Sequence, residues 1–207
     1  MSEKISFDLR HPKPLLIIIS GPSGVGKDTV VDRLRERNLP FHFVVTATSR
    51  PPRPGERDGI DYIFLTNEQF EKMIRRDEFI EYALVYSQYK GVPRSQFTAA
   101  MQAGKDMIMR VDVQGAAKFR QLFKEAVLIF LTPSSEEEWR ERLISRGSES
   151  DESLQIRLQT VQKEINQVGI FDYIVENPKG KLDQTVDTII AIIHAEHHRV
   201  KHREIQI

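Results

Sequence analysis

Short apolar runs alternate with longer amphipathic stretches along this chain. The first run, Leu15 to Ile19, is continuous and rich in β-branched residues, which is typical of a strand buried on both faces of a parallel sheet. Similar runs at 107–111 and 127–131 indicate further buried strands, and the runs at 41–45, 62–65 and 174–175 are also strand-like. The apolar pattern therefore predicts several strands that share one sheet.

Helical periodicity fills the intervals between these runs. Segments 29–37, 134–146 and 182–200 are predicted helices, and another is expected to begin at Thr66, with Glu68 and Gln69 in its first turn. In the segment 154–168, apolar residues recur at the spacing of one helix face; they are Leu154, Leu158, Val161, Ile165 and Val168. Strands that alternate with helices predict an α/β fold with a parallel sheet.

Composition narrows the classes of function. The length of 207 residues suggests a single domain, and the absence of cysteine excludes disulfides, thiolate metal sites and a cysteine nucleophile. Lys plus Arg equals Asp plus Glu at 30 each, so the total charge gives no reason to expect nucleic-acid binding. The run from Leu15 to Ile19 is too short to span a bilayer. We therefore expect no membrane partner and a cytoplasmic protein. The sequence leaves open the alternative of an organelle-targeted precursor from which the targeting segment was trimmed.

A glycine-rich turn joins the first predicted strand to the first predicted helix. Its spacing is G-x-x-x-x-G-K, in which glycines let backbone N–H groups wrap a phosphate and the helix N-terminus adds partial positive charge. The lysine supplies a mobile cation for the β- and γ-phosphates of a nucleotide. The alternative is an ordinary strand–helix turn. The residues of this candidate ATP site are Gly21, Pro22, Ser23, Gly24, Val25, Gly26 and Lys27.

The residue after the lysine departs from the usual motif. A Ser or Thr is expected there as a magnesium ligand, but the chain has Asp28, followed by Thr29. Magnesium accepts both carboxylate and hydroxyl oxygens. The sequence therefore leaves open whether Asp28 or Thr29 binds Mg²⁺ next to ATP.

A second basic segment follows at 48–56. Arg50 and Arg53 lie three positions apart in a loop stiffened by prolines, and two forked guanidinium groups suit a phosphate dianion. A solvated basic turn would have the same composition. The loop is a candidate phosphate site, but this segment alone does not decide between a phosphate site and a solvated turn.

Several longer stretches together resemble the guanylate kinase family. They are GPSGVGK at 21–27, SRPPRPGERDGIDYIF at 49–64, EFIEYA at 78–83, VDVQGA at 111–116 and ERLISRG at 141–147. The resemblance implies an ATP-dependent, Mg²⁺-dependent kinase that converts GMP, and also dGMP, to GDP or dGDP by direct in-line transfer. It also implies a P-loop core at 15–45, 99–132 and 158–207, a GMP-binding region at 46–98 and a lid at 133–157. The expected partners are small molecules, and a monomer and a homodimer both fit.

Matching positions carry the family's site residues onto this chain. The resemblance implies that Arg50, Arg53 and Tyr62 hold the phosphate of GMP, with Glu56 beside them, and that Thr46 and Asp112 line the guanine site. Glu81 is implied to pair with the guanine edge; independently, its two acceptor oxygens match the adjacent N1–H and N2–H₂ donors. The structural alternative for Glu81 is an acid at the end of a surface helix. For Asp112 it is an acid that caps the next turn. Implied catalytic residues are Lys27, Arg142, Arg146 and Arg157.

The chain departs from the family pattern on the acceptor side. Lys90 stands where the family has a phosphate-contacting tyrosine, and Val92 stands where a hydroxyl would reach guanine. Lys90 is a candidate replacement cation for the phosphate. Val92 cannot donate a hydrogen bond from its side chain, so the selection of guanine is open.

A base also replaces an acid two positions before Asp112. This residue, Arg110, is expected to point the same way as Asp112, because alternate residues of a strand share a face. An unpaired charge in a cleft is unfavourable. We therefore expect Asp28 and Arg110 to compensate each other, by pairing, by Asp28 helping to hold magnesium, or by both.

Two further classes of function fit parts of the sequence. A kinase for a different phosphorylated small molecule is supported by Val92 and opposed by Glu81 and Asp112. Guanylate-kinase-like domains also act as inactive scaffolds that bind proteins, but these typically have degraded phosphate loops. Lys27 and the loop glycines are intact here.

Overall fold

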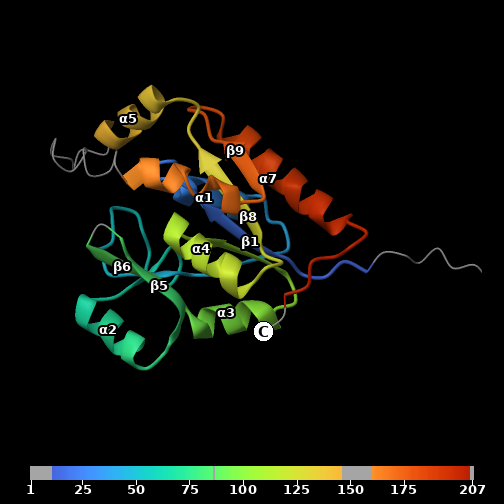
Figure 1. Ribbon diagram of the computed structural model, residues 1–207. Coiled ribbons are helices and arrows are strands. Elements are labelled where there is room, and N and C mark those ends of the chain that lie inside the picture. Colours follow the sequence, from blue (N-terminus) through green and yellow to red (C-terminus); the bar gives the residue numbers. More distant parts are fainter. Residues whose placement is uncertain (1–10, 86, 146–159, 206–207) are drawn as a thin grey trace, which may run out of the picture.

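A parallel sheet forms the centre of the computed structural model, which describes residues 11–85, 87–145 and 160–205 (Figure 1). Its strand order is β2-β7-β1-β8-β9, and all neighbouring strands run parallel. The predicted α/β fold with a parallel sheet is confirmed. The strands are β1 (Leu16–Ser20), β2 (Phe41–Phe43), β7 (Asp106–Arg110), β8 (Val127–Thr132) and β9 (Tyr173–Glu176).

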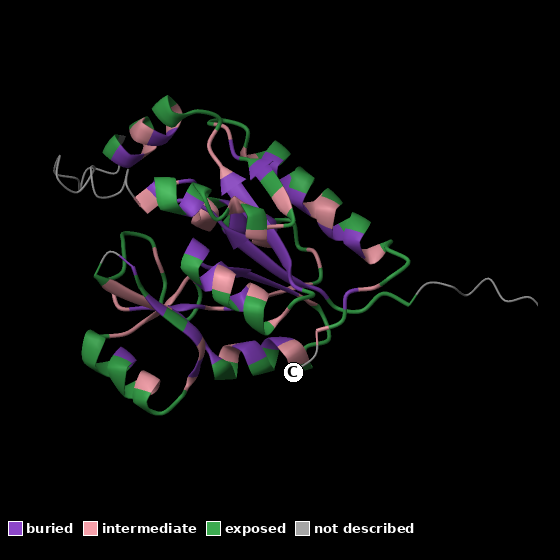
Figure 2. Cartoon of the chain, viewed as in Figure 1, coloured by how far each residue is buried: buried purple, intermediate pink, exposed green. Residues whose placement is uncertain are grey.

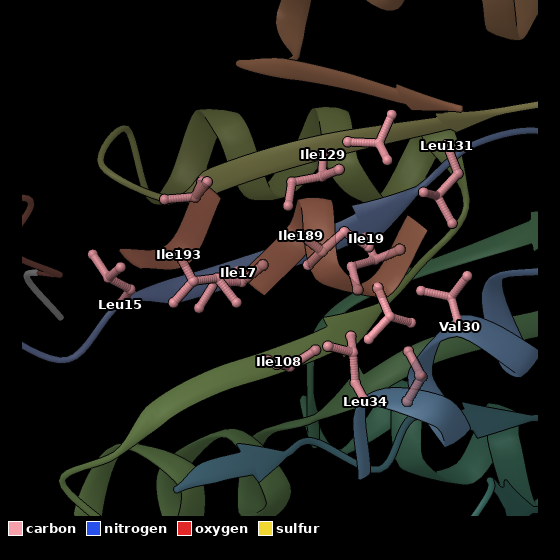
Figure 3. Close-up of a cluster of buried hydrophobic side chains, with 14 of the residues drawn as sticks. Leu15, Ile17, Ile19, Val30, Leu34, Ile108, Ile129, Leu131, Ile189 and Ile193 are labelled. Carbon is pink, nitrogen blue, oxygen red and sulfur yellow. The ribbon is translucent and has the colours of Figure 1, made fainter. Parts of the chain in front are cut away.

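Helices cover both faces of this sheet because β1 is apolar on both sides. Ile17 and Ile19 pack toward α1 (Lys27–Glu36) and α7 (Leu182–His197), in the cluster drawn in Figure 3. Leu16 and Ile18 pack on the opposite face with residues of α3 (Arg94–Gln102) and α4 (Val113–Leu122). The three inner strands, β1, β7 and β8, are buried almost throughout, whereas the helices expose their outer sides (Figure 2). The continuous apolar run at 15–19 is thus explained by burial on both faces.

A smaller sheet lies beside the core, in the order β4-β3-β6-β5. Its strands are β3 (Ala47–Thr48), β4 (Ile63–Phe64), β5 (Phe79–Val85) and β6 (Gln88–Pro93), and α2 (Asn67–Arg75) packs against it through Phe70. The predicted helix start at Thr66 is confirmed, since Thr66 and Gln69 form a reciprocal capping box. The sequence did not predict β5. A charged residue, Glu81, occupies one of its inward positions and breaks the apolar alternation.

The region after β8 contains α5 (Glu136–Ser145), a helical stretch at 160–165 and a short 3₁₀ helix, Val168–Ile170. The predicted amphipathic helix of this region is only partly tested, because Leu154 and Leu158 lie outside the described residues. Val161 is buried as expected, but Ile165 is 45% exposed and Val168 belongs to the 3₁₀ helix. The buried neighbour of Val161 is instead an acid, Glu164, at 7% exposure.

None of the helices in the described ranges is long and apolar enough to cross a membrane.

Candidate functional site

The glycine-rich turn lies at the carboxyl edge of the central sheet, directly after β1. Gly21 has φ 138°, and a Cβ there would lie 2.3 Å from the backbone oxygen of Leu131 on β8, so only glycine fits. Gly26 has φ 99° and caps α1 without any side-chain hydrogen bond. The first N–H groups of α1 therefore have no side-chain cap, which is the arrangement of a phosphate-binding helix N-terminus.

Lys27 lies folded against this turn. Its Nζ donates to the backbone oxygen of Gly21 at 2.5 Å and to that of Pro22 at 2.9 Å. Burial lowers the pKa of Lys27 to about 8, and the positive charge of Lys90 acts in the same direction. The carboxylates of Glu164, Asp28 and Asp112 oppose this shift. The ammonium group is thus poorly solvated and is bound by two backbone carbonyl oxygens.

The far wall of the turn is fixed by residues that follow β9 and by α5. The backbone oxygen of Val25 accepts from Arg142 Nη1 at 2.9 Å and from Asn177 Nδ2 at 2.8 Å. Trp139 of α5 donates from Nε1 to the backbone oxygen of Ser23 at 2.8 Å. These contacts hold the turn open next to a cavity lined by Gly24, Gly26, Thr29, Arg142, Asn177, Pro178, Lys179, Gly180 and Leu182.

The predicted lid arginines are tested unequally. Arg142 lies next to the glycine-rich turn, whereas Arg146 and Arg157 fall outside the described residues. Arg140, which matched nothing catalytic, pairs with Glu136 at 2.8 Å on the surface of α5. Asn177 was not among the predicted site residues, although its place directly after a strand at the carboxyl edge is a usable signal.

The arginine-rich loop faces the same edge from the other side. Arg50 is buried, and its two terminal nitrogens donate to the two carboxylate oxygens of Glu56, each at 2.6 Å. Glu56 also accepts from the backbone N–H of Arg53 at 2.7 Å, while the Arg53 side chain is exposed. Burial would raise the pKa of Glu56, but the hydrogen bonds from Arg50 and Arg53 lower it below its usual value. The loop is thus built around a bidentate anion contact.

Asp28 and Arg110 form the pair that the sequence suggested. Arg110 Nε lies 2.6 Å from Asp28 Oδ1, and the Arg110 side chain is only 5% exposed. The hydroxyl of Tyr62 donates to the same Oδ1 at 2.7 Å and accepts from Arg110 Nε at 3.1 Å. Burial would raise the pKa of Asp28, but Arg110 and the Tyr62 hydroxyl lower it below its usual value. This three-membered contact joins α1, β7 and the segment before β4.

A narrow pocket continues inward from Tyr62 and Lys27. Its lining includes Glu81 on β5, and Oε2 of this side chain has no hydrogen-bond partner within the described part of the chain. Burial raises the pKa of Glu81 to about 8, and the negative charge of Asp112 contributes. The surface-helix alternative for Glu81 is therefore wrong. Further lining residues are Thr46, Ala47, Lys90, Gly91, Arg110, Val111 and Asp112.

Two neighbours shape the environment of Glu81. Asp112 is the N-cap of α4 and accepts from the backbone N–H of Gly115 at 3.0 Å, so it caps the turn and also lines the pocket. A Cβ on Gly115 would lie 3.0 Å from Glu81 Oε1, so this glycine makes room for the carboxylate. Val92, opposite Glu81 on β6, is fully buried in the core and does not line the pocket.

Comparison with known proteins agrees with this geometry. A family model described as guanylate kinase matches residues 13–196.

The chain belongs to the guanylate kinase family.

Its relatives are similar over most of their length. A "Guanylate kinase 2, chloroplastic/mitochondrial" of Oryza sativa subsp. japonica is 48% identical over 197 residues, which are 95% of this chain and 69% of the relative. A guanylate kinase of Clostridium tetani is 45% identical over 188 residues, 91% of this chain and 89% of the relative. The crystal structure of guanylate kinase from Anaplasma phagocytophilum superposes with a TM-score of 0.75 at 31% identity, covering 91% of this chain and 88% of that one.

The structure of this family member also brings an unpredicted acid to the site. Glu164, in the helical stretch 160–165, is buried, and its Oε2 has no hydrogen-bond partner among the described residues. Burial raises the pKa of Glu164 to about 7, although the positive charges of Lys27 and Lys90 oppose the shift. An acid three positions after Val161, on the predicted apolar face, was a signal for it.

Glu164 should make the stability of the protein depend on pH. The pKa of Glu164 is raised from 4.5 to about 7. The stabilising effect of the protonated side chain is therefore complete below pH 4.5 and is lost as the pH rises through 7. We expect Glu164→Gln to change the free energy of unfolding differently at the two pH values. Its effect at pH 8 should be more stabilising than its effect at pH 4.5, by on the order of 2 kcal/mol. Urea denaturation at both pH values measures this difference.

The exposed Glu125→Gln is the matched control, because it removes a carboxylate that burial does not affect. Equal effects of Glu164→Gln at the two pH values would show that Glu164 titrates as in the unfolded chain.

Proposed function

We propose that this protein transfers the γ-phosphate of ATP to GMP, and also to dGMP, forming GDP or dGDP. One observation carries the proposal: a buried carboxylate, that of Glu81, lies without a partner among the described residues at the inner end of a pocket that opens toward the phosphate-binding turn. Guanine offers two adjacent N–H donors that a carboxylate accepts together, and adenine offers no such pair.

The acceptor nucleotide would lie between the two sheets. Its base would enter the pocket at Glu81, with Thr46 and Asp112 on the walls. Its phosphate would reach Arg50, Arg53 and Tyr62, where Arg50 already binds a carboxylate in bidentate fashion. Lys90 lines the same pocket and supplies a further cation. The buried position of Val92 supports a guanine site in which this residue contributes core packing rather than a base contact.

The donor nucleotide would lie along the phosphate-binding turn. The uncapped N-terminus of α1 and Lys27 would bind the β- and γ-phosphates. The adenosine would occupy the cavity between Arg142 and the segment 177–182, which opens beside Gly24 and Gly26. The γ-phosphate of ATP and the phosphate of GMP would then both lie near Lys27, as direct in-line transfer requires.

Asp28 and Thr29 fit a magnesium ion in chemical type, since both offer hard oxygen atoms. Asp28 Oδ1 is used by Arg110 and Tyr62, while Oδ2 has no hydrogen-bond partner among the described residues. Thr29 is exposed and faces the cavity of the donor nucleotide. When bound, magnesium would neutralise charge on the β- and γ-phosphates. Oδ2 of Asp28 and the hydroxyl of Thr29 are the groups that would hold it, directly or through water.

Closure of two regions also belongs to this proposal. The region 46–98, which contains the smaller sheet, would close on GMP, and the region 133–157 would close on ATP with Arg142, Arg146 and Arg157. Closure would exclude water, so that ATP is not hydrolysed instead.

An ADP-production assay with ATP and Mg²⁺ tests the proposal. We expect turnover with GMP and dGMP and none with AMP, UMP or CMP in parallel wells. Turnover with another acceptor and none with GMP would support a kinase of different substrate. A folded protein without turnover, which also binds no ATP in calorimetry, would instead be a scaffold.

A further inference from the structure

The hydroxyl of Tyr62 has two partners at once. Its single proton is donated to Asp28 Oδ1 at 2.7 Å, and its oxygen accepts from Arg110 Nε at 3.1 Å. A phosphate that accepts a hydrogen bond from this hydroxyl must therefore replace Asp28 as the acceptor.

Arg110 fixes the ring as well as the hydroxyl. Its guanidinium carbon lies 4.3 Å from the centroid of the Tyr62 ring, and its Nη2 donates to the backbone oxygen of Asp61. Arg110 itself ends β7 and is paired in register with Ile19 of β1, so it belongs to the rigid central sheet. Arg110 thereby holds Tyr62 against the central sheet without any contribution from the arginine-rich loop at 48–56.

The pair also allows Tyr62 to be released without leaving a bare charge. When the Tyr62 hydroxyl donates to a phosphate oxygen instead, Asp28 still has Arg110 Nε at 2.6 Å, and the pair stays neutral. An unpaired carboxylate at this depth would be unfavourable. Exchanging one anionic acceptor for another, Asp28 for a phosphate oxygen, therefore needs little rearrangement.

We propose that Asp28 and Arg110 are positioning residues for the acceptor phosphate, which act by holding the hydroxyl of Tyr62 where it can donate a hydrogen bond to the phosphate of GMP. The inference rests on the proposed function, because it assumes that the acceptor phosphate binds at Tyr62. It adds a role for a pair that replaces the usual residues of the family at both positions. The phosphate-binding turn, through Asp28, thereby takes part in binding the other substrate.

A double-mutant cycle between the pair and the hydroxyl tests this role. Asp28→Ser with Arg110→Met removes both charges together, so that neither is left buried alone. The serine keeps a hydroxyl oxygen that magnesium accepts, so the KM for ATP is expected to stay unchanged. Tyr62→Phe removes only the hydroxyl. We expect each change to raise the KM for GMP about tenfold, because each weakens one hydrogen bond to a charged group. Adding the pair substitution to Tyr62→Phe should raise this KM no further.

Two further measurements distinguish a positioning role from a general loss of structure. Thermal unfolding of each variant reports on folding, and the KM for ATP reports on the phosphate-binding turn. Both KM values rising together, or a triple variant in which the KM for GMP rises about a hundredfold, would overturn the positioning role, since the effects would then be general or independent. Absence of GMP turnover in the unmodified protein would instead overturn the proposed function and would be seen before any variant is made.

Discussion

Glu81→Gln is expected to lower kcat/KM for GMP about a thousandfold, while the KM for ATP stays unchanged. In the proposed site the carboxylate would accept both guanine donors, and two charge-assisted hydrogen bonds are together worth about 4 kcal/mol. A glutamine amide offers one acceptor and one donor, so its NH₂ group would face a guanine N–H. Steady-state kinetics with varied GMP at saturating ATP measures the loss.

Lost folding can be separated from lost recognition in this experiment. Burial without a partner among the described residues disfavours the ionised form of Glu81, so the stabilising effect of the protonated side chain is complete below pH 4.5 and is lost as the pH rises through about 8. The Gln variant should therefore be at least as stable as the unmodified protein at pH 9. The exposed Glu68→Gln is the control for the chemical change. Unaltered GMP kinetics in Glu81→Gln would remove the basis for guanine selection.

GMP binding should also release a proton that depends on Glu81. With a pKa of about 8, this side chain is largely protonated at pH 7 and must ionise to accept both guanine donors. Calorimetry at pH 7 in buffers of different ionisation enthalpy would show fewer protons released by Glu81→Gln than by the unmodified protein.

Lys27→Met is expected to lower kcat about a thousandfold and to leave the fold intact. Removing one preorganised charge from a site where negative charge develops commonly has an effect of roughly 10²–10³-fold or more. The native contacts of Nζ are two backbone carbonyls of the same turn, so few tertiary interactions depend on it. Single-turnover measurements with saturating ATP and GMP isolate this step.

Lys105→Met, exposed before β7 and therefore at the opposite edge of the sheet, is the control for loss of a positive charge. A Lys27→Met variant with normal turnover but weaker ATP binding would assign this lysine to binding alone.

The core of the fold followed from the sequence because its signals are local. The run at 15–19, the glycine spacing and the following helix lie consecutively in the chain, and each step has a direct backbone consequence. The smaller sheet was only partly predicted because β3 has two residues and β5 carries Glu81 at an inward position. Strand pairing over such short lengths depends on neighbours that are distant in sequence.

The contacts within the site were harder to predict than its members. Tyr62 and Asp28 are 34 residues apart, and Arg110 is 48 residues from Tyr62, so only the fold reveals that they share one hydrogen-bonded group. Two departures from the family pattern, together with the cost of an unpaired buried charge, indicated that Asp28 and Arg110 should compensate, and the pairing is confirmed. The burial of Glu164 was not predicted, because an acid in an amphipathic helix is normally assigned to the solvent side.

Trp139 gives the protein an optical reporter of its own. It is the single tryptophan of the chain, it is 3% exposed, and its indole N–H is bonded to the phosphate-binding turn at Ser23. Indole emission responds to local polarity and hydrogen bonding, so nucleotide binding or movement of α5 should alter both its intensity and its wavelength. Stopped-flow fluorescence of the unlabelled protein could then time the arrival of the donor nucleotide separately from the chemical step.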